Sequence, residues 1–286
     1  MPGTFLSALP NTDPNMAAKA VIGPVWRALR VTEHVLTGTL LALAAGLSRL
    51  VGLRCGWVSP ATQWWHRRLC ECLAIRLQST GEARAGALLV ANHISWLDVP
   101  VLGTLGHMTF VSKDEVRRWP VVGWLARASG TLFIKRGANQ TAATIEQIIA
   151  RLEGGGSVMI FPEGTTSDGR SMRRFHPRLF AAAQLTDLEL QPVAIRYGSN
   201  ARPDPIAPYI DDDTLVAHLL RVLRHPGMRV DVAFLEPVNA ADRARRTLAD
   251  SARVAIAARL DLTHSAELRS DVPRDTRSRP RAATHR

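Results

Sequence analysis

The stretch "GALLVANHISWLDVP", Gly86–Pro100, sets the local fold of this chain of 286 residues. Its first part, "GALLVAN", has the length and the apolar composition of a buried β-strand. A helix is expected to start at about Ser95, because Ser95-Trp96-Leu97-Asp98 has the S-x-x-D pattern of a capped helix terminus. His93 is therefore expected on the turn between a strand and a helix.

His93 and Asp98 form a candidate catalytic pair within this stretch. If both were helical, their side chains would lie about 140° apart around the helix axis. A turn at His93 instead lets the two side chains meet. The spacing alone is weak evidence, since His66 and Glu71 have the same separation. A simpler interpretation also stays open, in which Asp98 only caps the helix and His93 is a loop residue.

The chain after about residue 81 alternates between short apolar runs and amphipathic segments. Further strands are expected at Thr109–Lys113, Thr131–Arg136, Ser157–Glu163, Leu190–Tyr197 and Arg229–Glu236. Helices are expected at Asn139–Glu153, around Asp213–Arg224 and around Ala240–Leu260. This alternation predicts an α/β fold in which helices cover a central mixed sheet.

The N-terminal part has a different pattern. Val35–Ser48 is uncharged and largely apolar, but it is shorter than the roughly 20 residues that cross a bilayer. Four tryptophans surround it, together with Arg67 and Arg68: Trp26, Trp57, Trp64 and Trp65. Such side chains suit the headgroup layer of a membrane, so we expect a helical hairpin that lies in or dips into one leaflet. The alternative is a buried helix packed on a soluble domain.

Three regions are therefore expected along the chain. Residues 1–80 would form a membrane-associating helical region, residues 81–262 an α/β domain, and residues 263–286 a disordered tail rich in arginine. The net charge of +11 favours anionic partners. We expect the partner to be a membrane lipid surface and not a nucleic acid, because the aromatic residues lie near the apolar segment instead of along a basic strand. A non-catalytic membrane or nucleic-acid binding protein is the alternative from another class.

The sequence lacks the motifs of several enzyme classes. The sequence contains no G-x-S-x-G elbow of a serine hydrolase and no G-x-x-x-x-G-K-[ST] loop of a P-loop kinase. Its histidines form no H-E-x-x-H motif, and Cys70-x-Cys72 lacks the C-x-x-C spacing of zinc sites. We therefore expect no metal and no resident cofactor.

Four segments, in order, resemble the motifs of the glycerolipid acyltransferase superfamily, which includes the 1-acylglycerol-3-phosphate acyltransferases. "NHISWLD" (Asn92–Asp98) resembles the first motif, N-H-x-S-x-x-D, and "GTLFIKR" (Gly130–Arg136) resembles the second. "FPEGTTS" (Phe161–Ser167) resembles the third motif and "QPVAI" (Gln191–Ile195) the fourth. The resemblance extends over roughly Gly81–Glu236.

The resemblance implies transfer of a fatty acyl chain from acyl-CoA or acyl-acyl carrier protein to the hydroxyl of a lysolipid. His93 would be the general base, and imidazole, with an ordinary pKa near 6.5, suits this task. Asp98 would hold the imidazole in the correct tautomer and stabilise its charged form. The substrate hydroxyl is the nucleophile, so no catalytic serine is needed.

The resemblance also implies an acceptor pocket. Arg136, together with Glu163, Gly164 and Thr165, would line it, since a guanidinium suits a phosphate headgroup. Lys113 is a second candidate for binding an anionic headgroup.

The acceptor expected first is 1-acylglycerol 3-phosphate, which would give phosphatidic acid. Thr166 departs from the commonest form of the third motif, in which Arg often follows E-G-T. "FPEGTTSDG" also resembles a branch that acylates lyso-ornithine lipid, an aminolipid without phosphate, and this is the alternative acceptor. The expected location is the cytoplasmic face of a bacterial inner membrane, as a peripheral or monotopic enzyme.

Overall fold

The structure is a computed structural model and describes residues 14–53, 55–134, 138–186, 188–241 and 243–262. Two expectations from the sequence fall outside these described residues. They are the disordered tail at residues 263–286 and the position of Arg136.

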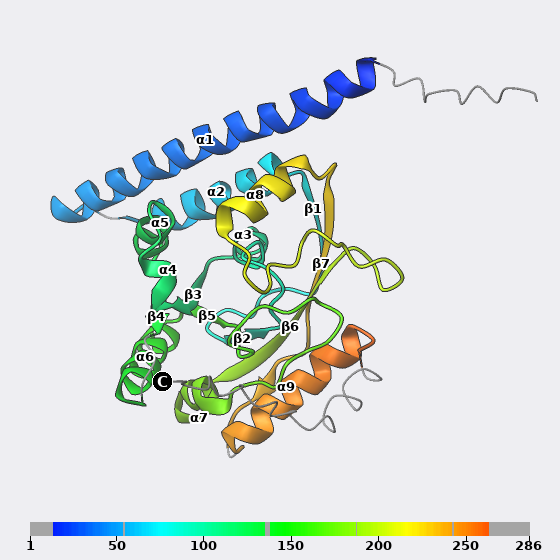
Figure 1. Cartoon of the computed structure of the whole chain (residues 1–286). Helices are drawn as coiled ribbons and strands as arrows, with labels where there is room; N and C mark the ends of the chain where they lie inside the picture. Colours follow the sequence, from blue (N-terminus) through cyan, green and yellow to red (C-terminus); the bar gives the residue numbers. More distant parts are fainter. Residues whose placement is uncertain (1–13, 54, 135–137, 187, 242, 263–286) are drawn as a thin grey trace, which may run out of the picture.

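One mixed sheet forms the centre of the described part of the chain (Figure 1). Its strands are β1 (Ile75–Thr80), β2 (Leu88–Ala91), β3 (Met108–Lys113), β4 (Leu132–Ile134), β5 (Ser157–Ile160), β6 (Glu189–Tyr197), β7 (Met228–Phe234) and β8 (Val238–Asn239). The strand order is β1-β7-β6-β2-β5-β3-β4, with β8 beside β6. Strand β6 runs antiparallel to β7 and β8, and the other pairs are parallel.

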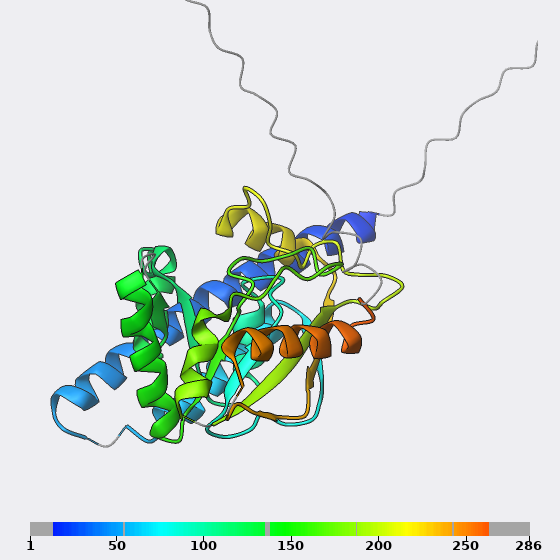
Figure 2. The same ribbon diagram turned by 90° about the horizontal axis from the view of Figure 1, so that it is seen from below.

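Helices cover both faces of the sheet. They are α1 (Pro14–Leu50), α2 (Val58–Cys72), α3 (Asp98–Gly103), α4 (Asp114–Arg117), α5 (Val122–Ala128), α6 (Ala138–Glu153), α7 (Ala181–Thr186), α8 (Leu215–Arg224), α9 (Arg245–Arg259) and the 3₁₀ turn η1 (Pro177–Phe180). In Figure 1, α2, α3 and α8 lie on one side of the sheet, below α1, and α6, α7 and α9 lie on the other. Figure 2, seen from below, shows α9 in front of the sheet. The predicted α/β fold is confirmed.

Strand β2 separates two hydrophobic clusters, because its side chains point alternately to the two faces. Leu89 belongs to the cluster under α2, α3 and α8. Leu88 and Val90 belong to the cluster under α6, α7 and α9. All three side chains are fully buried, which explains why this strand reads as a continuous apolar run.

Some elements differ from expectation, among them β1 and the start of α3. Strand β1 was not predicted; it lies in the segment assigned to the N-terminal helical region and pairs with β7 at the sheet edge. The helix expected from Ser95 begins at Asp98. Ser95 does not cap it, because the Ser95 hydroxyl is buried without a hydrogen-bond partner among the described residues. The Asp98 carboxylate instead accepts the N–H groups of Ile94 and Ser95.

The expected N-terminal hairpin consists of α1 and α2 (Figure 1). With 37 residues, α1 is much longer than the apolar run that predicted it. Within the described residues, Gly23–Leu50 is the one helix that is long and apolar enough to cross a membrane, by length and composition. Arg27 anchors α1 to the domain by donating to the Pro226 carbonyl just after α8, at 3.1 Å.

Candidate active site

His93 and Asp98 meet at the carboxyl end of β2, where the strand turns into α3. The Nδ1 atom of His93 lies 2.8 Å from Oδ2 of Asp98. Because a carboxylate only accepts, Nδ1 carries a proton, so the neutral form of the ring has its free lone pair on Nε2. The Asp98 side chain is 0% exposed and that of His93 is 19% exposed. The ring of His93 also stacks on Phe161, with centroids 4.1 Å apart.

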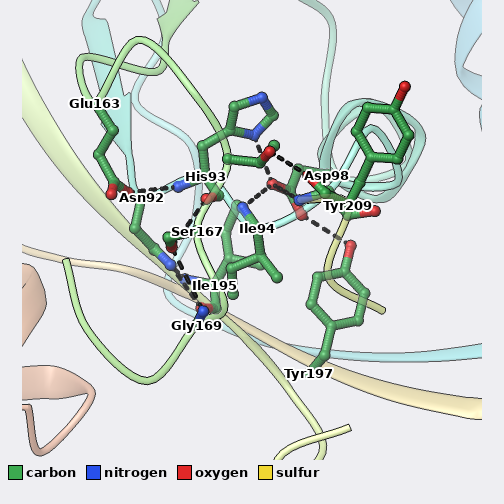
Figure 3. A network of polar contacts seen from close by, with 12 residues as sticks. Asn92, His93, Ile94, Asp98, Glu163, Ser167, Gly169, Ile195, Tyr197 and Tyr209 are labelled. Atoms are coloured by element: carbon green, nitrogen blue, oxygen red, sulfur yellow. Dashed lines mark hydrogen bonds and ion pairs between the residues drawn. The ribbon is translucent and has the colours of Figure 1, made fainter. Parts of the chain in front are cut away.

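Three further donors hold the Asp98 carboxylate in place (Figure 3). Ile94 N and Ser95 N donate to Oδ2, at 2.8 and 3.0 Å. The hydroxyl of Tyr197, at the end of β6, donates to Oδ1 at 2.9 Å. Burial, and then the charge of Asp98, raise the pKa of Tyr197 well above its ordinary value. Tyr197 therefore stays protonated and remains a donor.

The loop after β5 fixes the backbone of His93. Oε1 of Glu163 accepts from His93 N at 2.9 Å, and Oε2 accepts from Arg173 N at 2.8 Å. Ser167 N donates to the carbonyl of His93 at 2.8 Å. Burial raises the pKa of Glu163, while the two N–H groups act in the opposite direction. Both carboxylate oxygens of Glu163 are thus engaged by backbone groups.

Asn92 joins β2 to β6 just before the turn that carries His93. Its Oδ1 accepts from Ile195 N at 2.8 Å, and its Nδ2 donates to the Ile195 carbonyl at 2.9 Å. The side chain therefore continues the hydrogen-bonding of two parallel strands beyond the end of β2. The first, third and fourth motifs are held together at this edge of the sheet, where ligands of α/β folds commonly bind.

A cavity of about 1020 Å³ opens beside His93. Its walls are mainly apolar. The helices α1, α2 and α5 contribute Val31, Val35, Leu41, Leu69 and Leu125, among other residues. An apolar cavity of this kind suits a hydrocarbon chain. His93 lies in its wall, so the free Nε2 can act on a group bound there.

The other residues expected at the site are distributed as follows. Lys113, Gly164 and Thr165 line the cavity. Glu163 lies behind the lining, because its carboxylate is directed to the backbone of His93. Arg136 lies outside the described residues.

Sequence reasoning missed Phe161, Tyr197 and Tyr209 at the site. Tyr209 lines the cavity, and Phe161 packs on the ring of His93. Phe161 belongs to the quoted third motif, which could have indicated it, whereas neither tyrosine has a local signal in the sequence. Among the described residues, no group of three or more His, Cys, Asp or Glu side chains could hold a metal ion.

Comparisons with known proteins show which family this chain resembles. Residues 74–196 match the Acyltransferase family. A lyso-ornithine lipid O-acyltransferase of Pseudomonas aeruginosa is 44% identical over 226 residues, covering 76% of this chain and 88% of that protein. A lyso-ornithine lipid O-acyltransferase of Rhizobium meliloti is 37% identical, covering 71% of this chain and 77% of that protein.

Two more distant proteins also match. A 1-acyl-sn-glycerol-3-phosphate acyltransferase of Neisseria gonorrhoeae is 30% identical, covering 55% of this chain and 62% of that protein. The crystal structure of the 1-acyl-sn-glycerophosphate acyltransferase of Thermotoga maritima superposes with a TM-score of 0.63. It is 19% identical and is matched over 90% of this chain and 99% of its own, so it supports the fold.

Proposed function

This chain belongs to the acyltransferase family and is an O-acyltransferase; from that premise we propose that it transfers a fatty acyl chain from a thioester donor to the hydroxyl of lyso-ornithine lipid. The relatives from P. aeruginosa and R. meliloti carry this activity in their names, and each matches more than two thirds of this chain. We therefore favour lyso-ornithine lipid, the alternative acceptor indicated by the third motif.

One structural observation supports this acceptor. The hydroxyl of Thr166, which stands where an arginine is common, donates to the carbonyl of Tyr209. This position therefore offers no cation to the cavity. An ornithine headgroup carries a carboxylate and an ammonium group and no phosphate, so it does not require one here. 1-Acylglycerol 3-phosphate is the second candidate, supported by the Neisseria relative.

In the proposed reaction, His93 Nε2 takes the proton of the acceptor hydroxyl as its oxygen attacks the thioester carbonyl. Asp98 stabilises the imidazolium that forms, because its carboxylate accepts the Nδ1 proton. Collapse of the tetrahedral intermediate breaks the carbon–sulfur bond, and the imidazolium returns the proton to the thiolate. The products are the new ester and the free thiol of coenzyme A or acyl carrier protein.

We assign the remaining site residues from their surroundings. Lys113, Gly164 and Thr165 are proposed to contact the acceptor headgroup, since they line the cavity near His93. Arg136 is also proposed to contact the acceptor headgroup, because Gly130–Arg136 resembles the second motif. Glu163 is proposed to position the loop that carries His93, since both its oxygens accept backbone N–H groups.

The proposed location is the cytoplasmic face of a bacterial inner membrane. Acyl thioesters are made in the cytoplasm, whereas the acceptor is a membrane lipid. Helix α1 exposes a large apolar surface and also forms part of the cavity wall. A chain could therefore pass between the bilayer and the cavity along α1.

The test is acyl transfer by the detergent-purified protein. Labelled acyl-CoA and acyl-acyl carrier protein are each offered with lyso-ornithine lipid and, separately, with 1-acylglycerol 3-phosphate. We expect product mainly on the aminolipid, and a loss of about 10²- to 10⁴-fold in the His93→Ala variant. Product on the phosphate acceptor alone would refute the proposed acceptor. Full turnover by a folded His93→Ala protein would refute the base.

A further inference from the structure

The segment between β6 and α8 passes beside the His93 loop and is tied to both catalytic loops. Tyr209 N donates to the carbonyl of Ile94, in the loop after β2, at 3.0 Å. The hydroxyl of Thr166, in the loop after β5, donates to the carbonyl of Tyr209. The N–H and the carbonyl of Tyr209 are therefore each fixed by a different motif.

A buried histidine of α8 holds the same segment from the other side. Nε2 of His218 lies 2.9 Å from the carbonyl of Ile206 and 3.1 Å from that of Pro208. Trp96 Nε1 donates to Nδ1 of His218 at 2.9 Å, so the ring proton is on Nε2. Burial lowers the pKa of His218, which keeps the ring neutral. The ring of Tyr209 packs edge-on against it, with centroids 5.4 Å apart.

The backbone of Tyr209 and one edge of its ring are thus held in place next to the loop that carries His93. Tyr209 and His93 both line the cavity. Figure 3 shows the two rings on the same side of the hydrogen-bond network, with Tyr197 on the opposite side. The hydroxyl of Tyr209 makes no hydrogen bond to any residue that the structure describes, in contrast to that of Tyr197. It is available to a bound ligand.

We propose that Tyr209 is a specificity-determining residue whose hydroxyl donates to the carboxylate of the ornithine headgroup, and that Thr166 is the positioning residue that holds it there. The inference rests on the proposed acceptor. At the position where an arginine is common, Thr166 contributes no charge and instead fixes a neutral donor on the neighbouring segment. A substitution within the third motif would therefore act on specificity through Tyr209.

The choice of a neutral donor has a physical reason. Burial, and then the charge of Asp213, raise the pKa of Tyr209, so its hydroxyl keeps its proton at neutral pH. A phenol can donate to a carboxylate without repelling the ammonium group of the same headgroup. An arginine at position 166 would instead favour a phosphate, which carries more negative charge and offers more acceptor oxygens.

The experiment measures steady-state kinetics of the full chain in detergent with lyso-ornithine lipid as acceptor. We expect Tyr209→Phe to raise the acceptor KM about fivefold to tenfold, as for loss of one hydrogen bond. The kcat and the donor KM should stay within about twofold to threefold. Thr166→Val should act in the same direction, and Thr166→Ser should restore the wild-type KM.

Thr186→Val is the matched control. Its hydroxyl also donates to a backbone carbonyl, that of Ala182 at 2.8 Å, but it lies on α7, on the other face of the sheet. This variant should leave both KM values unchanged. An unchanged acceptor KM in Tyr209→Phe would overturn the role of Tyr209. An equal rise of donor and acceptor KM would also overturn it.

The activity of the wild-type protein distinguishes a failure of the proposed acceptor from a failure of the proposed role of Tyr209. If it acylates 1-acylglycerol 3-phosphate but not the aminolipid, the proposed acceptor fails, and the headgroup assigned to Tyr209 fails with it. If it acylates the aminolipid and Tyr209→Phe does so with the same acceptor KM, only the inference about Tyr209 fails.

Discussion

At the scale of single residues, the site is assembled around Asp98. Its buried carboxylate accepts from the His93 ring, from two backbone N–H groups and from Tyr197. A buried charge is tolerated when its hydrogen-bonding capacity is met. The orientation of the base therefore depends on donors from its own turn and from the end of β6.

Removing the Tyr197 hydroxyl should slow the reaction. In Tyr197→Phe, Oδ1 of Asp98 loses its donor, so the carboxylate is held less firmly against the imidazole of His93. The kcat should fall by about threefold to tenfold, while the acceptor KM should change by less than about twofold. Steady-state kinetics with lyso-ornithine lipid measure both values. Tyr209→Phe, which leaves Asp98 untouched, should show the opposite pattern, and an unchanged kcat in Tyr197→Phe would contradict the assignment.

His66 should make the protein less stable in acid. Burial, then the charges of His34 and His107, lower the pKa of His66 from 6.5 to about 4. The unfolded chain therefore binds a proton at this position between these two values, while the folded chain does not. The neutral His66 does not reduce the free energy of unfolding above about pH 6.5. As the pH falls from there to about 4, the free energy of unfolding decreases by roughly 3 kcal/mol.

Melting temperatures in detergent between about pH 7.5 and 4.5 test this expectation, with His66→Leu as the comparison. The other titrating groups are shared by the two proteins, so the difference between their slopes reports His66. The wild-type protein should lose more stability on acidification than the variant. Parallel slopes would be inconsistent with a buried neutral imidazole.

At the scale of elements, α1 packs on α2 through a glycine. The ring of Trp65 stacks on His34, and its Nε1 donates to the carbonyl of His34 at 3.1 Å. A Cβ atom at Gly38, one turn further along α1, would lie only 2.4 Å from Trp65 Nε1. The contact of α1 with the domain thus depends on the absence of a side chain at one position.

Gly38→Leu should weaken the attachment of α1. The indole of Trp65 is held by stacking and by its hydrogen bond, so the new side chain must displace it, at a cost of about 1–3 kcal/mol. Gly46→Leu is the control on the same helix, because a Cβ there meets nothing within 4 Å. Melting in detergent and limited proteolysis of residues 51–57 report the effect. Equal behaviour of the two variants would show that α1 does not dock through Trp65.

At the scale of the whole molecule, α1 presents many of its large apolar side chains to the outside, on the surface that does not face the cavity. Those more than half exposed are Val25, Trp26, Leu29, Leu36, Leu40, Leu43, Leu47 and Leu50. Soluble monomers rarely expose a continuous apolar surface of this extent, and such surfaces mark sites of interaction with membranes or proteins. The net charge of +11 favours an anionic bilayer as the partner.

Vesicle flotation of the full chain after detergent removal tests this surface. Changing Leu36, Leu40 and Leu43 together to Ser should reduce the bound fraction by about tenfold or more, since each exposed leucine contributes to burial in lipid. Leu185→Ser, at a side chain 69% exposed on α7, is the control on the opposite side of the sheet. Binding to anionic vesicles should weaken as salt is raised. Undiminished binding by the triple variant would contradict membrane association through α1.

The strands that were predicted all contain local apolar runs. Strand β1 has no such run, so the sequence did not indicate it. "IRLQST" is short, and its last three residues are exposed. It becomes a strand through pairing with β7, where Ile75 lies opposite Met228. Such a partner cannot be read from a window of neighbouring residues, whereas the buried run of β2 can.

The local parts of this protein can be predicted from neighbouring residues. The apolar run of β2, the turn at His93 and the carboxylate of Asp98 lie within a few residues of one another, and the backbone geometry of that turn brings the pair together. The contacts between distant segments depend on the folded arrangement of the chain. Glu163 accepts a hydrogen bond from the backbone of His93, Tyr197 donates one to Asp98, and Thr166 donates one to the carbonyl of Tyr209. These contacts form because sheet pairing and packing bring their loops to one edge of the sheet. Those contacts depend on the relative placement of whole elements, which no local pattern encodes.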